Sequence, residues 1–106
     1  WASWCGPCRK HSEEMIPVYR KYADKGFTVV GIAREQYVSD ALEAIREDGY
    51  PWVQLIDLHD EFCIWLRHGI GNSGGCLFLV DPEGKIAAIR PSAEEVEAIL
   101  EQHLGH

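Results

Sequence analysis

Two cysteines separated by two residues are the side chains whose type and spacing point most directly to chemistry. Cys5 and Cys8 enclose Gly6 and Pro7, and an amphipathic run follows at once from Arg9. The first turn of a helix leaves backbone N–H groups unpaired and carries partial positive charge, which favours a thiolate over a thiol. This setting lowers a cysteine pKa from about 8.5 towards about 7 or below. The pattern indicates a redox pair in which Cys5 is the nucleophile and Cys8 is the resolving thiol.

A Cys-x-x-Cys pair is also half of a zinc site, so metal binding is the first alternative. A tetrahedral zinc site needs two more Cys or His ligands at short spacing, and no second Cys-x-x-Cys occurs. His11 lies three residues after Cys8, with no further ligand near it in the sequence. A c-type haem site needs His directly after the second cysteine, where this chain has Arg9. We therefore expect no metal and no bound cofactor.

Composition bounds the class of protein and its partners. The 106 residues are 46% hydrophobic and 25% charged, which is typical of one small globular domain. The net charge is −7 and the ten Lys and Arg residues are scattered, which argues against nucleic acid or an anionic membrane as partner. No apolar run approaches the roughly 20 residues of a membrane helix. Because the chain begins at Trp1 without a methionine, we interpret it as a piece of a longer chain whose targeting segment would lie upstream.

Hydrophobic periodicity predicts alternating helices and strands after the cysteine pair. Helices are expected over residues 9–25, 40–48, 61–68 and after Ser92, and strands over 27–33, 53–56, 76–80 and 85–89. Ser39 is expected to cap the second helix, with Leu42 and Ile45 turned inward. Ser92 and Glu95 form a capping box for the last helix. The turn signal Asp-Pro-Glu-Gly at 81–84 predicts that the last two strands form an antiparallel hairpin.

Further residues are candidates for the site because of where the expected strands end. Glu35 follows the strand expected over 27–33, and ligands gather at the carboxyl ends of strands in open α/β sheets. It is either an acid–base residue beside the cysteines or a solvated loop carboxylate. Cys63 is expected to be a small buried hydrophobe within the third helix. The glycine-rich stretch 69–75 lacks a phosphate-binding pattern, and its glycines are expected to serve unusual backbone angles or the close approach of another backbone.

Several stretches together resemble the thioredoxin-like thiol:disulfide oxidoreductases of the TlpA/ResA type. These are Trp1–Arg9, Gly26–Phe27 with Val29–Gly31, Tyr50–Trp52 and Phe78–Ile86. The resemblance covers nearly the whole chain and implies an α/β, thioredoxin-like fold with a mixed sheet flanked by helices. It implies that Cys5 attacks and Cys8 resolves. It also implies that Pro7 helps to set the redox poise, and that Trp4 shields the disulfide. The Gly6–Pro7 pair between the cysteines resembles that of the reducing members of the family.

The resemblance also implies a substrate, a partner and a location. The substrate would be a disulfide-containing protein, and electrons would come from an upstream redox partner without a bound cofactor. Location would be extracytoplasmic, in the bacterial periplasm or cell envelope. The alternative is a non-catalytic thioredoxin-like module that binds a metal or a partner through Cys5 and Cys8. Peroxiredoxins share the fold, but their Pro-x-x-x-Thr-x-x-Cys stretch does not occur here.

The chain departs from the family pattern in two places. The family has a central strand immediately before the cysteine motif, between the strands that we place at 27–33 and 76–80. We therefore expect residues 1–106 to be a single thioredoxin-like domain that is incomplete at its N-terminus and lacks the strands upstream of the motif. The second departure is Gly75, which stands where the family has a cis-proline beside the cysteines, and Cys76 follows it. Gly75 and Cys76 are thus expected near the cysteine pair, and a redox role for Cys76 is a hypothesis.

Overall fold

The first helix begins directly after Cys5 in the computed structural model, which describes residues 1–70 and 75–104. α1 (Gly6–Tyr22) has Pro7 in its first turn, where the missing N–H leaves no hydrogen bond unmade. Cys5 is the N-cap, and its Sγ accepts the N–H of Cys8. A short 3₁₀ helix, η1 (Ala23–Lys25), ends the segment at Gly26 with φ of 105°. Local sequence therefore places the cysteine pair at the positive end of a long helix.

Two parallel strands form the sheet beside α1. β1 (Val30–Glu35) pairs with β2 (Val53–Leu58), with Val30 opposite Val53 and Glu35 opposite Leu58. β1 thus begins later than expected and extends through Glu35.

α2 (Val38–Asp48) joins the two strands and ends at Gly49, whose φ is 73°. It buries Ala41 and Ala44, whereas Leu42 is 50% exposed. The expected inward position of Leu42 is therefore wrong: the small alanine side chains face inward instead. The helix begins at Val38 with Tyr37 as its N-cap, so the predicted cap at Ser39 is also wrong.

The C-terminal half contains the predicted hairpin and last helix. β3 (Phe78–Val80) pairs antiparallel with β4 (Ile86–Ile89). Asp81 Oδ1 closes the turn by accepting the N–H groups of Glu83 and Lys85, both at 2.9 Å. α4 (Ala93–Leu104) begins after Ser92, whose Oγ accepts the N–H of Glu95 at 3.1 Å, so this cap is confirmed.

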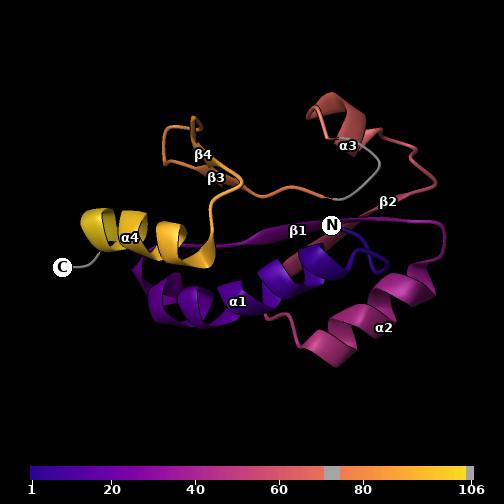
Figure 1. Cartoon of the computed structure of the whole chain (residues 1–106), viewed down its shortest axis with the longest axis horizontal. Coiled ribbons are helices and arrows are strands. Elements are labelled where there is room, and N and C mark those ends of the chain that lie inside the picture. The colour runs from indigo at the N-terminus through magenta and orange to yellow at the C-terminus, as the bar shows by residue number, and fades with distance from the viewer. Residues whose placement is uncertain (71–74, 105–106) are drawn as a thin grey trace.

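The two strand pairs do not join into one sheet within the described residues. β1–β2 and β3–β4 are separate two-stranded sheets, and Figure 1 shows the hairpin apart from β1. Trp1 lies on the edge of β1: its backbone nitrogen donates to Ile32 O at 2.9 Å, and its carbonyl accepts the N–H of Arg34 at 2.9 Å. This is the hydrogen-bond pattern of a parallel ladder. Trp1, at the start of the segment that leads into Cys5, is thus aligned like a residue of a strand beside β1.

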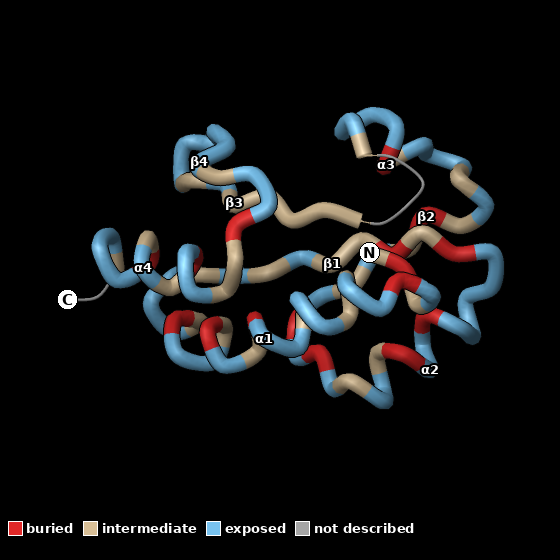
Figure 2. Tube along the Cα trace, viewed as in Figure 1, coloured by how far each residue is buried: buried red, intermediate tan, exposed pale blue. Residues whose placement is uncertain are grey.

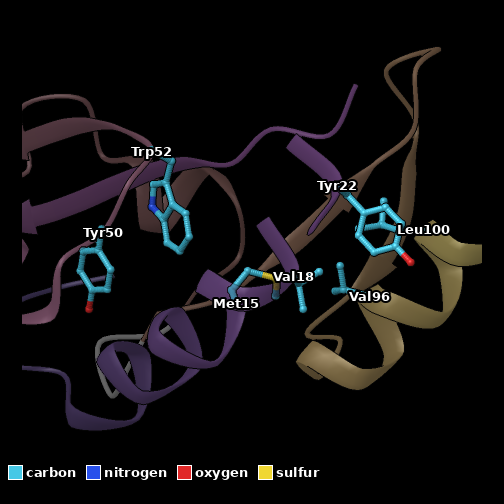
Figure 3. Packing of buried hydrophobic residues seen from close by; sticks show 7 residues of the cluster. All are labelled: Met15, Val18, Tyr22, Tyr50, Trp52, Val96 and Leu100. Atoms are coloured by element: carbon cyan, nitrogen blue, oxygen red, sulfur yellow. The ribbon is translucent and has the colours of Figure 1, made fainter. Parts of the chain in front are cut away.

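The main core lies between α1, α4 and the segment that leads into β2, and Figure 2 marks its buried segments in red. Figure 3 shows the seven buried residues: Met15, Val18, Tyr22, Tyr50, Trp52, Val96 and Leu100. Tyr22 is fully buried, and its hydroxyl donates to Glu101 of α4 at 2.6 Å. Burial of several large side chains at about 1.5–3 kcal/mol each holds α1 in place. The helix that presents the cysteines is therefore anchored at its far end.

The third helix differs most from expectation. α3 (Ile64–Arg67) is shorter than the predicted 61–68. Asp57, at 1% exposure, accepts the N–H groups of Phe62 at 2.9 Å and Ile64 at 3.0 Å, so a turn precedes the helix. Cys63 has a φ of 51° in that turn and is exposed, and the prediction that it is a buried hydrophobe is wrong. Trp65 is the buried residue of α3.

Candidate active site

The Cys5–Cys8 pair is joined by a disulfide across the first turn of α1. Their Cα atoms lie 5.3 Å apart, within the usual range for a disulfide. Cys5 Sγ accepts the N–H of Cys8 at 3.3 Å. The residues differ in exposure: Cys5 is 4% exposed, whereas Cys8 is half-buried. The helix N-terminus favours a thiolate on Cys5, but the covering side chains must give way before a substrate reaches that sulfur.

Trp65 of α3 is one of the side chains that pack around Cys5. It forms a buried cluster with Ala2 and Cys5, and the Cys8 side chain packs against this cluster. Trp4 is 56% exposed and lies on the Trp65 ring, with centroids 5.6 Å apart. Trp65 therefore packs with Cys5 directly, and Trp4 forms an outer layer. Sequence reasoning missed Trp65, because nothing in the sequence distinguished it from other apolar residues of the third helix.

A charged pair also contacts the Trp65 ring. The guanidinium of Arg34 lies 4.9 Å from the Trp65 ring centroid and forms an ion pair with Asp60. A cation over an indole face is stabilising and fixes the ring. A hollow of about 490 Å³ opens beside it, lined by Trp4, Arg34, Glu35, Gln36, His59 and Asp60.

Glu35 lies beside the cysteine motif but not in a loop. It is the last residue of β1 and is 4% exposed, so the interpretation as a solvated loop carboxylate is wrong. One carboxylate oxygen accepts the backbone N–H of Ser3, and the other accepts the Ser3 hydroxyl at 2.8 Å. The buried carboxylate is thus engaged with the segment that leads into Cys5. Its burial follows from these hydrogen bonds, which no sequence pattern indicated.

Gly75, in the second half of the chain, forms a hydrogen bond to the cysteine pair. Its N–H donates to Cys8 Sγ at 3.1 Å. A methyl group added at Gly75 would lie 2.9 Å from Cys8 Sγ and 3.1 Å from Trp1 Cα, so only glycine fits without a shift. No peptide bond among the described residues is cis. The expected proximity of Gly75 to the cysteines is therefore seen, with an N–H group where a proline has none.

Cys76 forms no disulfide with Cys5 or Cys8 in this structure. It is a half-buried free cysteine, and its Sγ lies 3.6 Å from the carbonyl oxygen of Leu77. Residues 71–74 of the glycine-rich stretch lie outside the described part of the chain. Nor do the residues that the structure describes contain a group of three or more His, Cys, Asp or Glu side chains arranged to hold a metal ion.

Arg9 ties the first turn of α1 to the end of α2. Its guanidinium donates to both carboxylate oxygens of Asp48, at 2.7 and 3.0 Å, and to the carbonyl of Ser3 at 3.3 Å. This guanidinium, through its hydrogen bonds, holds the pKa of Asp48 below its usual value. Tyr50 donates to the same carboxylate at 2.6 Å. Burial is the larger cause, and this hydrogen bond the second, of a raised pKa of the Tyr50 hydroxyl. The network thus holds the segment that carries Ser3 through its carbonyl, in addition to the Glu35 contacts to the Ser3 N–H and hydroxyl.

Comparison with known proteins places this geometry in a family. A model of the AhpC/TSA family matches residues 1–89. The chain is 30% identical to the thiol:disulfide interchange protein DsbE of Allochromatium vinosum, over 99% of this chain and 59% of that protein. It is 27% identical to the thiol-disulfide oxidoreductase ResA of Bacillus thuringiensis, over 81% of this chain and 48% of that protein. The chain thus spans about half the length of these curated relatives.

Solved structures share the fold. The thioredoxin domain of a thiol-disulfide oxidoreductase from Bacteroides vulgatus superposes with a TM-score of 0.85 at 30% identity, over 98% of this chain and 74% of that one. A thiol:disulfide interchange protein from Bacteroides sp. gives a TM-score of 0.86 at 29% identity, over 100% of this chain and 70% of that one. The thioredoxin-like fold expected from the sequence is therefore confirmed. The chain belongs to the AhpC/TSA family and is a thioredoxin-like protein of the TlpA/ResA and DsbE type.

Proposed function

We propose that this chain is a thiol:disulfide oxidoreductase that acts on protein disulfides. The observation that carries the proposal is the Cys5–Cys8 disulfide at the N-terminus of α1, where the helix favours thiolate on Cys5. The DsbE and ResA relatives are named for this chemistry. The thiols of Cys5 and Cys8 supply the electrons, so the reaction needs no bound cofactor.

The reaction runs in two exchange steps. The Cys5 thiolate attacks one sulfur of the substrate disulfide, forms a mixed disulfide, and releases the other substrate sulfur as a thiolate that takes a proton from water. The Cys8 thiolate then attacks Cys5 Sγ, so that the Cys5–Cys8 bond forms and the bond to the substrate breaks. The substrate disulfide gains two electrons and the enzyme dithiol loses them. An upstream thiol donor restores the dithiol by the reverse exchange.

The neighbouring residues position the pair. Gly6 and Pro7 set the turn between the cysteines, and Trp4 covers them as the outer layer on Trp65. Glu35 holds Ser3, and through it the segment leading to Cys5, as a positioning residue rather than a proton carrier.

Gly75 and Cys76 complete the proposed site. Gly75 brings the segment before β3 against Cys8. Cys76 is the nearest free thiol to Gly75 in the sequence and the candidate for a secondary disulfide.

Reduction of insulin with dithiothreitol as electron source tests the activity. We expect residues 1–106 together with their upstream residues to accelerate insulin precipitation, and Cys5→Ser in the same protein to abolish the acceleration. Cys63→Ser is the matched control, because Cys63 is exposed in the turn before α3, and it should leave the rate unchanged. Full activity in Cys5→Ser would refute the proposal.

The substrate is a disulfide-containing protein, and the location is extracytoplasmic, where disulfides persist. The resemblance to the TlpA/ResA type supports both. No helix in the described ranges has both the length and the apolar character to cross a membrane. Fractionation of cells that express the full-length protein tests the location.

Residues 1–106 form a single thioredoxin-like domain whose sheet is completed by a strand that leads into Trp1. Two observations support this: Trp1 is bonded to β1 like a parallel strand, and the β1–β2 and β3–β4 pairs are separate. Unpaired strand edges are costly to expose. We expect residues 1–106 alone to lack a cooperative thermal transition and a chain with its upstream residues to have one. A cooperative transition of the 106-residue chain alone would refute this arrangement.

A further inference from the structure

Each sulfur of the disulfide accepts its own backbone N–H, and the two donors come from different parts of the chain. Cys5 Sγ accepts from Cys8 at 3.3 Å, within α1. Cys8 Sγ accepts from Gly75 at 3.1 Å, across 67 residues of sequence. The first donor follows from the helix start. The second depends on a residue type that combines a free N–H with no side chain.

We propose that the Gly75 N–H is a catalytic group that stabilises negative charge on Cys8 Sγ. This inference rests on the proposed function and extends it to the second cysteine. Hydrogen bonds to charged acceptors are stronger than those between neutral groups, so the contact gains strength when Cys8 becomes a thiolate. The absence of a side chain at position 75 allows the approach, since a methyl group there would lie 2.9 Å from the sulfur.

Both directions of the exchange place charge on this sulfur. In substrate reduction, the Cys8 thiolate attacks Cys5 Sγ, the Cys5–Cys8 bond forms, and the substrate sulfur leaves with the electron pair of the broken bond. When a thiol donor regenerates the enzyme, the donor thiolate attacks Cys5 Sγ and Cys8 leaves as the thiolate. The Gly75 N–H thus serves the resolving nucleophile in one direction and the leaving group in the other.

The sharpest variant removes the N–H and adds no atoms. Gly75→glycolic acid replaces the amide N–H by an ester oxygen, whereas any side chain at this position would also crowd Cys8 and Trp1. Gly84→glycolic acid is the matched control, because it removes a glycine N–H that donates to Asp81 at 3.0 Å in the hairpin turn. All proteins are the full chain with its upstream residues, and all carry Cys63→Ser and Cys76→Ser so that only the pair reacts.

The first measurement is NMR titration of reduced protein with ¹³Cβ-labelled cysteine. We expect the pKa of Cys8 to rise by about one unit in the Gly75 ester and to stay unchanged in the Gly84 ester. The second measurement is the release of thionitrobenzoate from its mixed disulfide with Cys5. At pH 7 this resolution step should slow about threefold in the Gly75 ester, because about tenfold less Cys8 thiolate is partly offset by its greater nucleophilicity.

A third measurement needs no variant and decides the matter if the Gly75 ester does not fold. The Gly75 amide proton of the reduced protein should move downfield with the same midpoint as the Cys8 titration. A Gly75 amide chemical shift that does not change as Cys8 ionises would overturn the proposal. A Gly75 ester in which the Cys8 pKa is unchanged would also overturn it. The proposed function fails separately, by inactivity of the unmodified protein towards insulin.

Discussion

Glu35 gives the most informative test of how the structure holds the cysteine motif. Its carboxylate is 4% exposed and accepts both the N–H and the hydroxyl of Ser3. Hydrogen bonds to charged groups contribute about 1.5–3 kcal/mol each, and the partner left unpaired in a buried site costs about 1–3 kcal/mol. Glu35→Ala removes both bonds, so we expect it to destabilise the folded protein by about 3 kcal/mol or more.

Two further variants divide this effect. Ser3→Ala removes only the 2.8 Å hydroxyl contact and should cost about 1.5 kcal/mol. Glu35→Gln keeps an oxygen for the Ser3 N–H and offers an amide to the Ser3 hydroxyl, so it should cost about 1 kcal/mol, the difference between charged and neutral hydrogen bonds. Because Ser3 and Glu35 are in contact, the double variant Ser3→Ala with Glu35→Ala should be less destabilised than the sum of the single effects.

Urea unfolding of the full chain measures these differences, and insulin reduction by the same proteins separates the two roles of Glu35. If the carboxylate only positions Ser3, Glu35→Gln retains nearly full activity with an unchanged pH profile. If it carries protons, Glu35→Gln loses activity and its pH profile changes while its stability is nearly kept. A Glu35→Ala protein within about 0.5 kcal/mol of wild type would refute the positioning argument, since this is the usual range for surface substitutions. Glu83→Gln, in the exposed hairpin turn, is the matched control.

Two other predictions follow from neighbouring contacts. Arg9→Met leaves Asp48, 9% exposed, without its cation, and should destabilise the protein by about 1–3 kcal/mol at pH 7. Because Arg9 depresses the pKa of Asp48 in the folded state, this stabilisation is present above the usual value of 3.8 and is lost as pH falls through the lower folded value. Unfolding experiments at pH 7 and at low pH should therefore show the difference between the two proteins shrinking, and a difference that grew on acidification would contradict the argument. Peptide mapping of the oxidised protein by mass spectrometry tests Cys76: a redox role requires a disulfide to Cys76, and finding only the Cys5–Cys8 bond would remove it.

The sequence predicted the elements whose signals are local. Pro7 after Cys5, Ser92 before Glu95 and the turn at 81–84 each carry their own backbone chemistry, and these elements form as expected. The Cys5–Cys8 pair also stood out in the sequence, because Cys-x-x-Cys before an amphipathic run has few other uses, and the structure joins the two residues by a disulfide.

Contacts between segments that are distant in the chain could not be predicted from the sequence. The short α3 and the exposure of Cys63 follow from Asp57 accepting two N–H groups beyond its own strand. Glu35 is buried because Ser3, 32 residues away, satisfies its carboxylate. A single sequence carries no pattern for such pairings, and the same holds for the packing of Trp65 on Cys5.

The different exposure of the two cysteines makes their roles the central question. Cys5 is the N-cap of α1, where the helix favours a thiolate, whereas the side chain of Cys8 is more exposed to solvent. Trapping with a single-cysteine variant separates these roles, because an enzyme without its resolving thiol accumulates the mixed disulfide. The most direct measurement is therefore mass spectrometry of Cys8→Ser and Cys5→Ser, each incubated with an oxidised protein substrate. We expect Cys8→Ser to hold the substrate on Cys5 and Cys5→Ser to hold none. An adduct on Cys8 in Cys5→Ser, with none in Cys8→Ser, would show that the assigned order is reversed.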